Sequence, residues 1–245
     1  MRWAGHLSAA LRPFPGSPMS EMMEAVDRLY RVRFPERDRE RRDQLWAVLC
    51  SSFFQRYIRP TDCVLDLACG YGEFIRHISA SRKLAVDLNP DSRAALADHD
   101  VEFHQAAADK LVGIADGSID VCFTSNFFEH LATKKVMDDT LLEVRRALRP
   151  GGIFIALQPN IKYLAAEYWD FYDHVLPLSH LSAQEAFVKA GFEIDQVVAR
   201  FLPFTTKSRL PQHPWLVRLY LYMPIAWRVF GRQFLIVGRK PASQI

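Results

Sequence analysis

Short apolar runs alternate with amphipathic stretches along most of the chain. Runs of this length, rich in β-branched and aromatic residues, are typical of buried strands, whereas the amphipathic stretches have a helical period. Strands that alternate with helices predict a mainly parallel sheet with helices on both faces. The expected strands are Cys63–Ala68, Leu84–Leu88, Val101–His104, Val121–Ser125 and Ile153–Leu157, and the expected helices between them are Glu73–Ser79, Ser92–Ala97 and Val136–Leu148.

The two ends of the chain complete this pattern. N-terminal helices are expected within residues 21–60, and Pro150-Gly151-Gly152 predicts a turn that ends the long helix before it. A helix over Ser182–Ala190 precedes two last strands, Phe192–Arg200 and Gln233–Arg239. The sequence therefore predicts an α/β fold, namely a Rossmann-like, doubly wound, mostly parallel seven-stranded sheet with helices on both faces.

Composition limits the domain organisation and the setting. The 245 residues suffice for one sizeable core, so we expect a disordered lead-in over 1–20 and a single domain over 21–245. The chain has no run of about 18–20 apolar residues, so we predict no transmembrane helix. The net charge of +3 is too small to indicate a nucleic-acid partner. Four cysteines are too few for a disulfide framework in a chain of this size, so we expect a reducing, cytoplasmic location. They also lack zinc-type spacing, so we expect no metal site.

A glycine turn after the first expected strand carries the candidate chemistry. Gly70 and Gly72 permit positive φ angles, and the helix that follows offers unpaired N–H groups to an anionic ligand. Asp87 ends the next strand, where a carboxylate can accept both hydroxyls of a ribose. This arrangement predicts a nucleoside ligand. A nicotinamide-dependent oxidoreductase is the alternative, but Ile75 stands where a dinucleotide site has its third glycine.

Five motifs together resemble the class I S-adenosylmethionine-dependent methyltransferases, specifically their type 11-like small-molecule subgroup. The resemblance covers roughly residues 45–200. Its motifs are DLACGYG at 66–72, VDLNP at 86–90, DGSIDVC at 116–122, EHL at 129–131 and LEVRRALRPGG at 142–152. The resemblance implies S-adenosyl-L-methionine as cofactor and methyl transfer to a small-molecule or lipid-like acceptor. A cofactor-binding protein of the same fold without turnover is a further alternative.

The resemblance also implies a set of cofactor-binding residues. Asp66 and Gly70, with Ala68 in the same turn, would flank the methionine end, and Gly72 would let the backbone approach the ligand. Asp87 would bind the ribose and Leu88 would pack on the adenine. The adenine amino group would be met by Asp109, beside Ala108, and the methyl-transfer site would be bordered by Asn126.

Two histidines are candidate general bases, because imidazole titrates near neutral pH and a hydroxyl acceptor must lose a proton. His130 follows the fourth core strand, and His174 follows the fifth with Asp173 beside it. The alternative for both is a structural role in holding a loop.

The region 201–232 combines aromatic and basic residues with little acid. It could be a lid over a greasy acceptor, a segment that contacts a membrane surface, or an insertion that packs on the core. Peripheral membrane contact is therefore one candidate partner interaction among these three.

Overall fold

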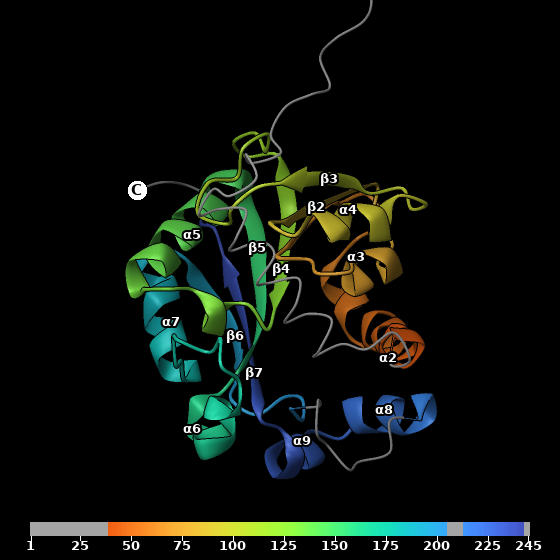
Figure 1. Cartoon of the computed structure of the whole chain (residues 1–245), viewed down its shortest axis with the longest axis vertical. Helices are drawn as coiled ribbons and strands as arrows, with labels where there is room; N and C mark the ends of the chain where they lie inside the picture. The colour runs from red at the N-terminus through yellow and green to blue at the C-terminus, as the bar shows by residue number, and fades with distance from the viewer. Residues whose placement is uncertain (1–38, 205–212, 243–245) are drawn as a thin grey trace, which may run out of the picture. The chain divides into compact units, whose positions relative to one another are not determined.

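The computed structural model describes residues 39–204 and 213–242 (Figure 1). The chain divides into two compact units, Met1–Arg39 and Glu40–Ile245, and all described residues except Arg39 belong to the second. The expected lead-in over 1–20 and the expected helices over 21–38 lie outside the described residues. The single domain expected over 21–245 stays a prediction.

A seven-stranded sheet forms the centre of the second unit, in the order β3-β2-β1-β4-β5-β7-β6. The first five strands along the chain run parallel, whereas β7 is antiparallel to both β5 and β6. The predicted fold class is confirmed. The strands are β1 Cys63–Leu67, β2 Arg82–Asp87, β3 Glu102–Gln105, β4 Ile119–Ser125, β5 Leu148–Pro159, β6 Glu193–Val198 and β7 Gln233–Arg239.

Helices cover both faces of the sheet (Figure 1). On one face, α5 and α7 contribute residues such as Val144 and Phe187 to a core shared with Leu65 and Leu67 of β1. On the other face, α2, α3 and α4 pack against Val64 and Phe123. The α-helices are α2 Arg39–Ser52, α3 Glu73–His77, α4 Pro90–Leu96, α5 Lys134–Ala147, α6 Ile161–Leu164, α7 His180–Lys189, α8 Pro214–Leu221 and α9 Pro224–Phe230, and the 3-10 helices are η2 Phe54–Tyr57, η3 Phe128–His130 and η4 Ala165–Asp170.

Side-chain caps fix where several of these helices begin. Asn89 accepts from the Asp91 amide at 3.0 Å at the start of α4. Thr133 caps α5 through a 3.2 Å bond from Val136 N, and Ser179 forms a capping box at the start of α7. Because an N-cap is worth about 1 kcal/mol, these short polar residues set the helix boundaries more firmly than propensity does.

The turn predicted at Pro150-Gly151-Gly152 is wrong. The long helix already ends at Ala147, and β5 begins at Leu148, which pairs with Ile119 before a register shift. Gly151 has φ 76°, and a Cβ on Gly152 would lie 3.0 Å from the Asp120 carbonyl oxygen. The glycines therefore permit an irregular pairing that keeps the segment inside the sheet.

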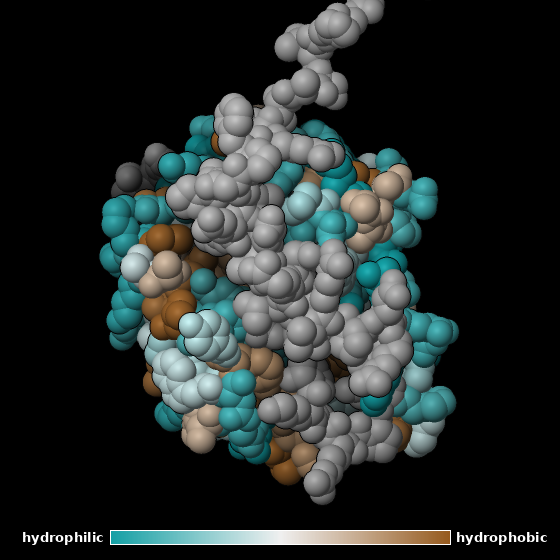
Figure 2. Space-filling view, in the orientation of Figure 1, coloured by the Kyte–Doolittle hydropathy of each residue, from teal (hydrophilic) through white to brown (hydrophobic). Residues whose placement is uncertain are grey.

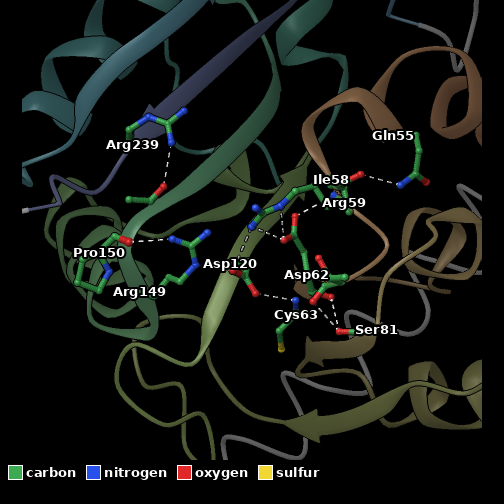
Figure 3. Close-up of polar contacts among 12 residues, drawn as sticks. Gln55, Ile58, Arg59, Asp62, Cys63, Ser81, Asp120, Arg149, Pro150 and Arg239 are labelled. Atoms are coloured by element: carbon green, nitrogen blue, oxygen red, sulfur yellow. Dashed lines mark hydrogen bonds and ion pairs between the residues drawn. The ribbon is translucent and has the colours of Figure 1, made fainter.

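A polar network ties the amino ends of the central strands together (Figure 3). Asp120 of β4 accepts from Cys63 N at 2.8 Å and also from the Arg149 guanidinium of β5. Asp62 accepts from the Arg59 backbone and side chain at 2.8 and 2.9 Å. These bonds lie at the amino ends of the strands, opposite the carboxyl ends that carry the candidate ligand residues.

Candidate functional site

The carboxyl ends of β1, β2 and β4 lie side by side, because β1 pairs with both neighbours in parallel. The chain changes winding direction between β1 and β4, and ligands of open α/β sheets bind at such switch points. The turn after β1, the end of β2 and the loop after β4 meet at this edge. These are the three segments in which the sequence places most of its candidate residues.

The turn from β1 into α3 has an unusual backbone. Ala68, Gly70 and Gly72 all have positive φ angles, of 56°, 55° and 74°. A left-handed conformation costs a non-glycine residue roughly 1–2 kcal/mol, so Ala68 is strained. Such strain is commonly held at ligand-binding sites. The turn is fixed by Gly72 N, which donates to Cys69 O at 2.8 Å.

Gly72 is required for a reason that the sequence did not indicate. A Cβ at this position would lie 2.4 Å from the Cδ2 of Leu96 in α4. The missing side chain therefore lets α4 pack against the turn, in addition to permitting the positive φ. The role of Gly72 in letting a cofactor approach stays a prediction.

Asp66 is a buried carboxyl group at the carboxyl end of β1. Burial, together with the nearby charges of Glu73 and Asp87, raises its pKa well above the ordinary range, against the lowering effect of a hydrogen bond from the Ile75 backbone. Its Oδ2 has no hydrogen-bond partner among the described residues. A buried acceptor of this kind has an uncompensated desolvation cost, which a cationic ligand group would remove.

Asp87, at the end of β2, is half-buried and braces the glycine turn. Its Oδ2 accepts from Gly70 N at 2.8 Å and its Oδ1 accepts from Asn89 N at 2.8 Å. Burial still raises its pKa, because it outweighs these backbone bonds. Each carboxylate oxygen has two lone-pair sites, so both oxygens can also accept from a ribose diol. The bracing of the turn was not foreseen from the sequence.

Leu88 and Asp109 lie in the loops that follow β2 and β3. Leu88 follows β2 with 38% of its surface exposed, so its side chain is available for a ligand. Asp109 is half-buried in the loop after β3, next to Ala108. Their adenine contacts stay predictions.

The loop after β4 is held by two buried glutamines. Asn126 is exposed, has φ 47°, and accepts from the Nε2 of Gln233 at 2.5 Å. Gln158 Oε1 accepts from the backbone of Phe127 at 2.9 Å and of Phe128 at 3.2 Å. Sequence reasoning missed both glutamines. The signal was available, since each glutamine adjoins an apolar strand run, where a buried amide needs a defined partner.

The two predicted bases meet in one cluster with Glu129. The ring centroids of His130 and His174 are 5.1 Å apart, and His130 Nε2 lies 3.9 Å from Glu129 Oε1. Asp173 Oδ2 lies 3.1 Å from His130 Nδ1. Burial disfavours the charged form of His130, but Asp173 and Glu129 outweigh that effect and raise its pKa. The structure thus joins residues that are 44 positions apart in the sequence.

Comparison with known proteins finds similarity to methyltransferases. A family model described as a methyltransferase domain, Methyltransf_11, matches residues 65–156. The probable methyltransferase ltbC of Aspergillus luteorubrus is 24% identical over 172 residues, which cover 62% of this chain and 58% of that relative. The chain therefore spans less than two thirds of that relative's length.

Solved structures share the fold at low identity. An S-adenosylmethionine-dependent methyltransferase from Thermotoga maritima is 18% identical with a TM-score of 0.63, covering 87% of this chain and 98% of its own. One from Archaeoglobus fulgidus is 19% identical with a TM-score of 0.57, covering 76% and 90%. The [4+2]-cyclase SpnF is 18% identical with a TM-score of 0.57, covering 82% and 81%.

The strand order and the glycine turn at the switch point define the class I S-adenosylmethionine-dependent methyltransferase fold. Residues 65–156 match the methyltransferase-domain model Methyltransf_11, and the cofactor of this fold class is S-adenosyl-L-methionine. The site fits that cofactor, because the Oδ2 of buried Asp66, which no residue in the described part of the chain bonds, suits the ammonium of an amino-acid tail.

Proposed function

We propose that this chain transfers the methyl group of S-adenosyl-L-methionine to a small-molecule or lipid-like acceptor. The observation that carries the proposal is Asp66, a buried carboxyl with an oxygen that no described residue bonds, beside a strained turn that Asp87 braces. This combination is suited to a ligand with both an ammonium group and a ribose.

The residues of the chain would bind and orient the cofactor. Asp66 would pair with the ammonium group and Asp87 with the ribose hydroxyls, while Leu88 offers an apolar surface to the adenine. When bound, the cofactor supplies a methyl group already activated on a sulfonium. The protein then has to align the acceptor with that methyl group, and Asn126 borders the place where it would do so.

A nicotinamide-dependent oxidoreductase fits less well. Ile75 is fully buried in the core between α3 and the sheet. A dinucleotide site needs a glycine at this point for close packing of the helix on the strand. Titration calorimetry should therefore show binding of S-adenosylhomocysteine and none of NAD. The opposite preference would refute the proposal for the cofactor.

Turnover needs its own test, since a neighbour with this fold is described as a cyclase. Purified full-length chain, incubated with cofactor labelled on the methyl group and with metabolite and lipid extracts, should transfer label to an extractable product. An Asp87→Ala variant is the matched control. Binding of S-adenosylhomocysteine without any label transfer would favour the alternative of a cofactor-binding protein without turnover.

The lipid-like part of the proposal is supported by α8 and α9. One face of this segment packs on the core, where Trp227 lies 5.0 Å from Phe201 and Tyr220 donates to Phe201 O. The rest is exposed and apolar, and hydrophobic colouring is visible at the position of α9 in Figure 2. Its exposed large side chains are Trp215, Leu219, Tyr222, Met223, Ile225, Val229 and Phe230.

The two helices carry Arg218 and Arg228 and no acidic residue. Apolar side chains next to arginines are suited to the surface of an anionic membrane, from which a lipid-like acceptor would come. Among the described residues, no helix is both long enough and apolar enough to cross a membrane. Contact through the face of α8 and α9 is therefore the form of membrane association that we propose.

A further inference from the structure

The cluster of Glu129, His130 and His174 has the composition of a metal site. One potential ligand atom from each residue lies within 4.8 Å of the other two. Two imidazoles and one carboxylate are a common ligand set for Zn²⁺ and other divalent transition metals. Glu129 and His174 are almost fully buried, and His130 keeps 27% of its side chain exposed, which gives the cluster an open side.

Both rings have their Nδ1 nitrogen fixed by oxygen acceptors. His130 Nδ1 lies 3.1 Å from the Asp173 carboxylate and 3.2 Å from the Asp173 carbonyl oxygen. His174 Nδ1 lies 2.9 Å from the carbonyl oxygen of Tyr168. A nitrogen that faces only oxygen acceptors carries the proton, so in the neutral ring the lone pair is on Nε2. Metal-ligating histidines are held in this way by carboxylates and carbonyls around the site.

The backbone holds the two halves of the cluster together without a metal. Val175 N and Leu176 N both donate to the carbonyl oxygen of Glu129, at 2.8 and 3.1 Å. The segment that carries His174 is therefore fastened to the 3-10 helix that carries Glu129 and His130. Tyr168 anchors the same segment, because its buried hydroxyl donates to Leu176 O at 2.7 Å.

We propose that Glu129, His130 and His174 bind one divalent transition metal ion of the Zn²⁺ type. In a tetrahedral zinc site with ligand bonds of about 2.0–2.2 Å, the ligand atoms lie about 3.4 Å from one another. The ligand atoms of the cluster lie within 4.8 Å of one another, so the side chains have to close by up to about 1.4 Å when the ion binds. Three protein ligands leave a fourth position for water or an acceptor oxygen.

This inference goes beyond the proposed methyl transfer and changes the predicted role of the histidines. A ring that donates its Nε2 lone pair to a metal cannot also accept a proton there. His130 and His174 would then act as ligands in place of general bases, and Asp173 would be a positioning residue for His130.

Zinc titration of the tag-free, metal-free full chain tests the inference. Calorimetry should show one Zn²⁺ per wild-type chain. Glu129→Gln and His130→Gln keep the size of the side chain, and each should weaken Zn²⁺ binding at least tenfold. His104→Gln is the matched control, since His104 pairs with Glu102 at 2.9 Å within β3, outside the cluster. It should bind Zn²⁺ like the wild type.

Two further measurements keep the result interpretable. Asp173→Asn changes the carboxylate that contacts His130 Nδ1, and loss of such an outer contact typically weakens a metal 10–100-fold. We expect about tenfold, because the Asp173 carbonyl oxygen still holds the ring. The visible spectrum of the Co²⁺-loaded chain should change in His130→Gln and stay the same in His104→Gln.

No Zn²⁺ uptake by the wild type, or equal uptake by Glu129→Gln and His130→Gln, would overturn the metal site and return the two histidines to the predicted base role. The cofactor proposal is tested separately, because the metal-free chain should bind S-adenosylhomocysteine either way. If it does not, the proposed function fails whatever the zinc result is.

Discussion

Replacement of Asp87 by alanine tests the nucleoside site most directly. In the complex, the carboxylate would accept two hydrogen bonds from the ribose. Charge-assisted bonds are worth about 1.5–3 kcal/mol each, but water replaces part of that in the variant. We therefore expect a loss of at least about 1.4 kcal/mol, which is a tenfold rise in the dissociation constant of S-adenosylhomocysteine.

The structure adds a second effect of the same substitution. Asp87 also accepts from Gly70 N and Asn89 N, so alanine releases the glycine turn as well as the ribose. Asp87→Asn is a milder change, because its one carbonyl oxygen can keep a single acceptor role, either to the turn or to the ribose. It should bind more weakly than the wild type and more tightly than Asp87→Ala.

Titration calorimetry measures the affinity and thermal unfolding verifies that each variant is folded. Asp98→Ala is the matched control: it removes one acidic charge from an exposed position in the loop after α4. Its dissociation constant should equal that of the wild type. A folded Asp87→Ala chain with unchanged affinity would refute the assignment of Asp87 to the ribose.

Three more predictions concern stability and surface contact. The fold raises the pKa of Asp66 above its value in the unfolded chain, so stability that is fully present at low pH is lost as pH rises through the folded pKa. Asp66→Asn does not titrate, so it should raise the free energy of unfolding at neutral pH by about 1 kcal/mol, and it should abolish cofactor binding. A variant that is less stable in chemical denaturation would contradict this. Gly72→Ala should lower the free energy of unfolding by about 2 kcal/mol or more, because its Cβ would clash with Leu96. Gly117→Ala is the control: its Cβ would meet only Arg149 at 3.9 Å, so it should lose only the φ penalty of roughly 1–2 kcal/mol. Equal losses in the two variants would show that the Leu96 side chain moves aside without cost. The full chain should co-sediment with anionic vesicles at low salt and less at high salt. Ile225→Glu should reduce the fraction that co-sediments, whereas Val112→Glu, a control at an equally exposed position, should not. No co-sedimentation at low salt would refute the membrane proposal.

The sheet could be predicted because its signals are local. Each core strand is a short apolar run, and the alternation with helices fixes the parallel order. The glycine turn and Asp87 were found for the same reason, since a βαβ unit brings them together within about 20 residues. The boundary at Pro150-Gly151-Gly152 failed because glycine marks both turns and irregular strand pairing. Only the partner strand, through Ile119, decides between them.

The acceptor side could be predicted only in part, because its contacts are distant in sequence. Gln233 meets Asn126 across 107 positions, and His174 meets Glu129 and His130 through a segment that returns after β5. Spacing cannot show that two histidines lie in one cluster when the chain between them forms the helix α5, the strand β5 and two short helices. The individual residues were recognisable as chemically capable, whereas their grouping needed the fold.

These contacts divide the carboxyl edge of the sheet into two halves with different physical support. The cofactor half is braced by Asp87, a residue that also has to bind ligand, so its geometry and its affinity cannot be altered independently. The half after β4 is braced by Gln158, Gln233 and the backbone of Glu129, none of which needs to contact the cofactor in the arrangement proposed above. Partly exposed His130 can therefore be substituted with less disturbance of the cofactor site. It follows that acceptor preference should respond to changes at this position while the affinity for S-adenosylhomocysteine stays the same. Coupled losses at both halves would show instead that the loop after β4 also shapes the cofactor site.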